Sequence, residues 1–177
     1  MENLEITFTE ENPAKVSLER LTRESKIVAT IEDAPRREFN LNTEIAFLDH
    51  MLETIAWRSC LNIDATYENT QFRLTHVIAE DVGIVIGTAF ARIIEQRMQE
   101  GVNGAGSGTL GIDEALAIAS VSFEGRSVVT INLKNAPGAQ IVQVEDALAA
   151  DMAEFFRGFV QGARATVNIQ ALSGDDP

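Results

Sequence analysis

The chain contains few of the residues that most often mark a reactive or cross-linked protein. Its 177 residues include one cysteine, Cys60, and two histidines, His50 and His76. A single cysteine cannot form a disulfide bond within the chain, and nothing else in the sequence indicates an oxidising compartment. Because histidine is so scarce, the position of each one bears directly on function.

Basic residues are also scarce, and long apolar runs are missing. Lysine and arginine number 14 against 27 acidic residues, which gives a formal net charge of −13. A surface this negative repels phosphate backbones, so we expect no nucleic-acid partner. The longest apolar run, residues 82–91, is too short to cross a bilayer, and the N-terminus lacks the basic start and apolar stretch of a signal peptide. We therefore expect a cytoplasmic protein with no membrane partner.

The periodicity of apolar residues predicts a mixture of strands and helices. Alternating and β-branched residues predict strands at residues 15–33, 61–68, 126–133 and 165–172. Amphipathic spacing predicts helices at residues 44–57, 77–100 and 144–163. Gly101 is expected to end the second helix, and residues 113–125 are expected to form a helical turn leading into a strand.

The same order of strands, helix and strand occurs twice. Residues 49–65 align with residues 153–169 without a gap, which places His50 against Glu154 and Ile63 against Val167. The glycine-rich stretch 101–109 is interpreted as the connector between the halves. A phosphate-binding loop is the alternative, disfavoured because no Lys-Ser/Thr follows it and no strand directly precedes it. We predict an α+β fold with an internal duplication, forming one compact domain.

His76 and Glu80 stand four residues apart, so one helix face would carry both side chains toward a single cation. Imidazole with carboxylate suits zinc, manganese or iron better than calcium or magnesium. The alternative is a helix N-terminus at which Glu80 and Asp81 complement the helix dipole. His50 lies beside the apolar stripe of the first helix, where a histidine is commonly structural.

Two further polar positions lie in the predicted strands. Alternation would place on one strand face the residues Arg20, Thr22, Glu24 and Lys26. The alternative is a solvated strand face. Arg126 could bind an anionic substrate group through its planar guanidinium, and the alternative is a turn arginine between strands.

Six stretches of the sequence together resemble imidazoleglycerol-phosphate dehydratase, in order and with matching spacing over nearly the whole chain. They are RLTRESKI, FLDHMLETIA, HVIAEDVGIVIG, GIDEALA, FEGR and AEFFRGFV. The resemblance implies two similar α+β halves of the ribosomal S5 domain 2-like type, each a β-sheet with helices packed on one face. The first half would be residues 1–100 and the second residues 101–177.

The resemblance also implies a function. Members of the family are lyases of histidine biosynthesis that remove water from imidazole glycerol phosphate to give imidazole acetol phosphate. They hold two manganese ions per active site between subunits, bind the imidazole ring as an imidazolate, and assemble from trimers into a cage of twenty-four subunits. We therefore expect a homo-oligomer that binds manganese and a small phosphorylated imidazole substrate.

Site residues follow from the resemblance position by position. His50 matches a metal ligand in the first helix, and His76 and Glu80 match the outer members of a His-His-x-x-Glu motif. Glu154 stands where a histidine ligand is frequent, and a carboxylate can also bind manganese.

The remaining matches concern the substrate. Glu24 matches a glutamate near the reacting carbons and is the expected catalytic group. Arg20, from the same signature, and Arg126 match substrate-binding positions.

The sequence also departs from the family pattern. Val77 replaces the second histidine of the first His-His-x-x-Glu motif, and valine cannot coordinate a metal. Asn103 and Gly104 stand where arginines for the phosphate are common. The second motif would begin immediately after Pro177, so we expect the second half to lack its final helix. The alternative function is therefore a non-catalytic or altered-substrate relative that keeps the oligomeric scaffold.

Overall fold

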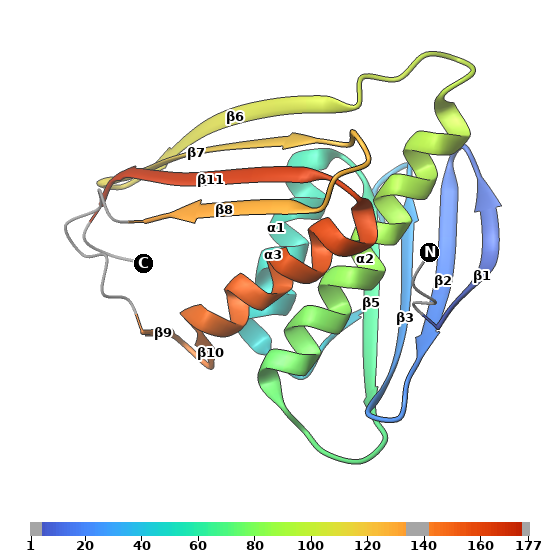
Figure 1. Ribbon diagram of the computed structural model, residues 1–177, viewed down its shortest axis with the longest axis horizontal. Coiled ribbons are helices and arrows are strands. Elements are labelled where there is room, and N and C mark those ends of the chain that lie inside the picture. Colours follow the sequence, from blue (N-terminus) through green and yellow to red (C-terminus); the bar gives the residue numbers. More distant parts are fainter. Residues whose placement is uncertain (1–4, 134–141, 175–177) are drawn as a thin grey trace.

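A five-stranded mixed sheet forms one side of the molecule (Figure 1). The computed structural model describes residues 5–133 and 142–174 of the chain. The strands lie in the order β1-β2-β3-β5-β4. They are β1 (Ile6–Asn12), β2 (Lys15–Leu21), β3 (Ser25–Glu32), β4 (Leu41–Asn42) and β5 (Asn62–Asn69). Alternation along β2 and β3 directs Leu18, Ile27 and Ile31 into the core, as the period of a strand requires.

The second sheet has four strands in the order β6-β7-β11-β8. They are β6 (Ala105–Ile112), β7 (Ala115–Ser122), β8 (Val128–Asn132) and β11 (Thr166–Ser173). A short two-stranded ladder of β9 (Gln143–Val144) and β10 (Ala147–Leu148) lies apart from both sheets.

The two sheets repeat one topology, which confirms the predicted pair of similar α+β halves. In the first sheet β2 and β3 are antiparallel, β3 and β5 are antiparallel, and β5 and β4 are parallel. In the second sheet β6 with β7, β7 with β11, and β11 with β8 follow the same pattern. β1 is an additional strand, which the sequence did not predict.

Among the described residues, three helices lie between the sheets (Figure 1). They are α1 (Ala46–Ser59), α2 (Thr75–Arg97) and α3 (Ala149–Ala163). α1 packs against β4 and β5, and α3 packs in the equivalent way against β8 and β11. α2 covers β1, β2, β3 and β5 and also packs along α3. In the described part of the chain, none of the helices has the length and apolarity that a membrane span requires.

Glycines allow α2 and α3 to approach until their backbones touch. A side chain at Gly158 would overlap the carbonyl oxygen of Glu80, and one at Gly83 would overlap that of Phe155. Gly87 meets Phe159 and Ala163, whereas Gly83 meets Phe155 and Phe159, so the two helices run in the same direction. The first turns of α3 therefore lie beside the first turns of α2.

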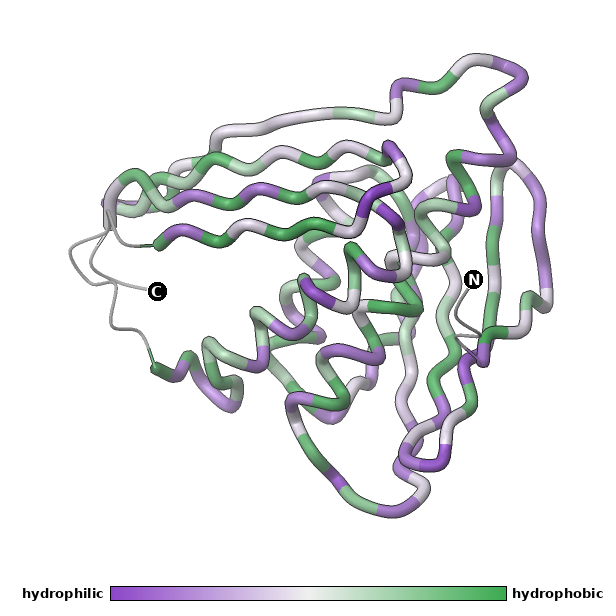
Figure 2. The backbone as a smooth tube through the Cα atoms, in the orientation of Figure 1, coloured by the Kyte–Doolittle hydropathy of each residue, from purple (hydrophilic) through white to green (hydrophobic). Residues whose placement is uncertain are grey.

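The second sheet is less covered than the first. α3 packs on β8 and β11, and every residue of β6 is exposed. Figure 2 colours much of β6 close to neutral, because glycine, serine and threonine alternate there with few strongly apolar residues. Leu110 and Ile112 are 48% and 61% exposed, so this sheet presents apolar surface to the solvent.

Three predicted elements were wrong in part. Residues 113–125 contain no helical turn, because Ala115–Ser122 pairs along its length with β6 and β11 as strand β7. The glycine-rich stretch 101–109 is a connector only as far as Gly104, after which β6 begins. The helix predicted at 144–163 begins at Ala149, since the preceding residues form the β9–β10 turn.

Candidate active site

His76 and Glu80 lie at the beginning of α2, on one face of the helix. His76 is exposed and Glu80 is half-buried. The helix starts after Leu74, and no side chain caps its first turn. The alternative prediction was that Glu80 and Asp81 complement the helix dipole. Asp81 does not do so, because it is buried in the second turn of the helix. The pair thus offers one imidazole and one carboxylate to a cation, donors that suit a transition-metal ion.

His76 and Glu80 have no third metal ligand beside them among the described residues. Within residues 5–133 and 142–174, no three His, Cys, Asp or Glu side chains form a group that could hold a metal ion. Val77, next to His76, is half-buried and supplies no donor atom. Any further ligands must therefore come from outside the immediate surroundings of His76 and Glu80.

Glu24 lies in a tight turn. The prediction that Glu24 shares one strand face with Arg20, Thr22 and Lys26 was therefore wrong. β2 ends at Leu21 and β3 begins at Ser25, so residues 22–24 reverse the chain instead of continuing a strand. The Thr22 N–H donates to the Ser25 carbonyl at 2.8 Å and closes the turn. The Glu24 side chain is exposed, and its own N–H donates to the Thr22 hydroxyl at 3.1 Å.

Arg20 is close to this turn but lies largely within the protein. Its guanidinium forms an ion pair with Asp81, and its side chain is 14% exposed. The second oxygen of Asp81 accepts a hydrogen bond of 2.6 Å from the Ser25 hydroxyl. A substrate-binding role for Arg20 stays a prediction. Asp81 was not predicted as the partner of Arg20, although an acidic residue next to an apolar run is a signal that burial would require a partner.

His50 lies on the exposed side of α1, at a hollow of about 440 Å³. The hollow is lined by Arg37, Glu38, Phe39, Leu41, Asp49, His50, Glu53 and Trp57. The guanidinium of Arg36 stacks on the ring of Trp57, 3.7 Å from its centroid. His50 therefore faces the exterior of the chain, and neither His76 nor Glu80 lines its hollow.

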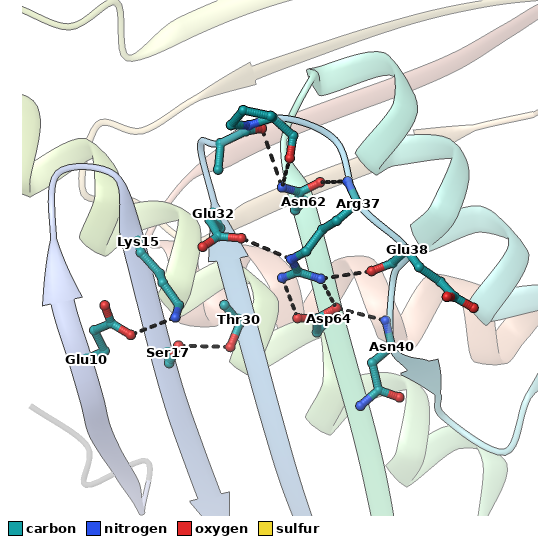
Figure 3. Close-up of polar contacts among 12 residues, drawn as sticks. Glu10, Lys15, Ser17, Thr30, Glu32, Arg37, Glu38, Asn40, Asn62 and Asp64 are labelled. Atoms are coloured by element: carbon teal, nitrogen blue, oxygen red, sulfur yellow. Dashed lines mark hydrogen bonds and ion pairs between the residues drawn. The ribbon is translucent and has the colours of Figure 1, made fainter.

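A network of charged side chains supports the loop that forms this hollow (Figure 3). Arg37 donates to both oxygens of Asp64, at 3.0 and 2.7 Å, and to Glu32 at 3.1 Å. Burial opposes ionisation of Asp64, but hydrogen bonds from Arg37 and the Asn40 N–H outweigh it and lower the pKa of the carboxyl group. The same pairing raises the pKa of Arg37. This loop is therefore fixed to β5 by charged contacts.

Asp146 fixes the beginning of α1 from the other half of the molecule. Its carboxylate accepts the N–H groups of Ala46 and Phe47 at 2.7 and 2.9 Å. The Phe47 N–H and then the Ala46 N–H lower the pKa of Asp146. These two N–H groups have no partner inside the helix, so Asp146 acts as a cap supplied from a distance. This contact was not predicted from the sequence.

Glu154 and Arg126 lie on the second half. Glu154 is half-buried on α3 and forms an ion pair with Arg157, which it would have to leave to bind a metal. Because α2 and α3 run in the same direction, Glu154 lies toward the helix ends that carry His76 and Glu80. Arg126 is exposed in the turn before β8, and no described residue pairs with its guanidinium. It is thus available to an anionic group.

Most of the chain is similar to one family of enzymes. The family model of imidazoleglycerol-phosphate dehydratase matches residues 43–177. The dehydratase of Koribacter versatilis is 32% identical over 160 residues, which cover 90% of this chain and 79% of the relative. That of Methylococcus capsulatus is 31% identical over 163 residues, covering 92% of this chain and 80% of the relative.

Solved structures give the same result. The imidazoleglycerol-phosphate dehydratase of Staphylococcus aureus superposes with a TM-score of 0.70 at 26% identity, covering 90% of this chain and 85% of that chain. The corresponding enzyme of Pyrococcus furiosus superposes with a TM-score of 0.67 at 27% identity, covering 89% and 81%.

Proposed function

We propose that this chain, which belongs to the imidazoleglycerol-phosphate dehydratase family, converts imidazole glycerol phosphate to imidazole acetol phosphate. Family membership makes it a hydro-lyase of histidine biosynthesis. The observation that carries the specific proposal is the pair His76 and Glu80 at the start of α2, next to the turn that presents Glu24. We place the reaction in the cytoplasm.

The proposed cofactor is manganese. His76 and Glu80 would hold it through the imidazole nitrogen and the carboxylate. A bound ion would hold the substrate ring as an imidazolate, which can push electrons toward the carbon that loses its hydroxyl group. Since the part of the chain that the structure describes supplies two donors in this group, we propose that other subunits of a homo-oligomer built from trimers supply the rest. The outward-facing His50 and Glu154 are the candidate ligands.

Two side chains would act on the glycerol phosphate portion. Glu24 is exposed and would accept the proton from the middle carbon of the glycerol portion, while the hydroxyl group on the carbon next to the ring takes up a proton and leaves as water. The enol formed in this way becomes the ketone of the product. Arg126 would bind the phosphate through its guanidinium fork. Asn103 and Gly104 carry no charge, so phosphate binding would rest on fewer cations than two arginines could supply.

A second candidate function is favoured by one residue. Val77 removes a donor beside His76, so a chain that keeps the scaffold without turnover is the alternative. The two are separated by assaying purified protein with Mn²⁺ for formation of imidazole acetol phosphate. We expect slow turnover that is lost in His76→Ala and in Glu24→Gln. Product formation that is absent, or that survives His76→Ala, would count against the dehydratase.

A further inference from the structure

A buried polar cluster joins the turn that carries Glu24 to the helix that carries His76 and Glu80. Asp81 is 7% exposed and uses both carboxylate oxygens. Oδ1 pairs with Arg20, and Oδ2 accepts the hydroxyl of Ser25, which is fully buried. A carboxylate this far from water is stable only when partners replace its hydration, so the cluster strongly favours one arrangement.

The turn itself is fixed by Thr22. Its hydroxyl accepts the N–H of Glu24 at 3.1 Å and the N–H of Ser25 at 3.0 Å. It also lies 3.2 Å from the Ser25 hydroxyl. Glu24 and Ser25 therefore keep a fixed relative position, and whatever holds Ser25 also holds Glu24.

A second attachment comes from the segment that leads into α2. The Thr70 N–H donates to the Glu24 carbonyl at 3.2 Å, and the Thr70 hydroxyl donates to the Arg23 carbonyl. Residues 70 and 81 thus both bind the turn, and His76 and Glu80 lie between these two attachments. No side chain caps the first turn of α2, so these contacts restrain it in addition to its packing on α3 and the sheet.

We propose that Asp81 is a positioning residue for the candidate metal pair. Through Ser25 and Arg20 it sets the separation between Glu24 and the helix turn that carries His76 and Glu80. The role in metal binding rests on the proposed function, whereas the contacts of Asp81 are independent of it. Residues that orient metal ligands usually affect the affinity for the metal as well as the geometry of the site.

The test compares two aspartates that each form an ion pair with an arginine, and each pair has one member on the five-stranded sheet. Asp81→Asn removes the carboxylate charge of the buried pair, and Asp64→Asn removes that of the Arg37 pair, whose drawn contacts involve no residue of α2 (Figure 3). Hydrogen exchange read by mass spectrometry should rise for residues 22–25 and 70–80 in Asp81→Asn but not in Asp64→Asn. The affinity for Mn²⁺, measured well below the melting temperature, should fall about tenfold or more in Asp81→Asn and stay within about twofold in Asp64→Asn.

Each outcome decides something. Unchanged exchange in residues 22–25 and 70–80 of Asp81→Asn would overturn the inference, whatever the metal data. So would an unchanged Mn²⁺ affinity in a protein whose affinity does depend on His76. If the wild-type chain binds no Mn²⁺ but hydrogen exchange rises as expected in Asp81→Asn, then Asp81 does position Glu24 relative to α2, and the proposed function is contradicted. Should Asp81→Asn fail to fold, Ser25→Ala removes one of the two contacts and is judged by the same measurements.

Discussion

Cys60 and Arg164 end two helices in the same left-handed conformation, with φ of 59° and 49°. Cys60 follows α1, Arg164 follows α3, and each leads directly into a strand of its own half. The gap-free alignment of the halves pairs these two residues, as it pairs His50 with Glu154. The duplicated backbone therefore gives His50 and Glu154 equivalent positions on their helices, although their surroundings in a single chain differ.

The close packing of α2 and α3 predicts a large loss of stability in Gly158→Ala. Alanine would normally favour the helix by about 1 kcal/mol. Here the added carbon would overlap a backbone carbonyl, which cannot rotate away, so we expect a net loss of about 2 kcal/mol or more in the free energy of unfolding. Urea denaturation measures it. The control is Gly106→Ala, where nothing lies within 4 Å of the added carbon and the change should stay within about 0.5 kcal/mol. Equal effects of the two substitutions would contradict the packing.

The distant cap of α1 predicts that Asp146→Ala lowers the free energy of unfolding by about 1 kcal/mol at pH 7. The change removes the acceptor for the Ala46 and Phe47 N–H groups. Glu145→Ala removes the same charge from an adjacent exposed residue and should cost less than about 0.5 kcal/mol. A similar loss in both variants would indicate a general charge effect instead of a cap.

The contribution of Asp146 should also depend on pH. Its pKa is lower in the folded protein than in the unfolded chain, so the unfolded chain binds the proton more readily. The stabilisation is then complete above the unfolded value of about 4 and is lost as the pH falls through the lower folded value. The difference in unfolding free energy between wild type and Asp146→Ala should therefore shrink below about pH 4. A difference that stays constant down to pH 2 would be inconsistent with a charged cap.

The incomplete metal group predicts a homo-oligomer larger than a dimer. The described residues of one chain provide two clustered donors, His50 faces outward, and the second sheet exposes Leu110 and Ile112. Light scattering on the purified protein should give a mass of at least three chains. A stable monomer would remove the basis for ligands shared between subunits.

The sequence predicted helices and the repeat better than it predicted strands rich in small residues. The predicted positions of α1 and α2 agree with the structure to within a few residues. β6 and β7 consist largely of glycine, alanine and serine, whose local preferences favour loops or helices. Their strand conformation comes from pairing with each other and with β11, which no local pattern reveals.

The candidate site was predictable only where spacing along one element decides it. His76 and Glu80 share a face because they are one helical turn apart. The turn at Glu24 was missed, since RLTRESKI alternates like a strand on both sides of the reversal. Asp146 and Ala46 are 100 residues apart, and Asp81 and Ser25 are 56 apart. Such contacts depend on the completed fold.

The number of metal ions per chain tests the central claim most directly. Adjacent helical residues point about 100° apart, so His76 and the residue at position 77 would serve different ions. With valine at position 77, α2 should keep one metal position and lose the other. Equilibrium dialysis of the purified protein against Mn²⁺, followed by metal analysis, should give at most one tightly bound ion per chain and none in His76→Ala. Two tightly bound ions per chain, or one that survives His76→Ala, would contradict the account.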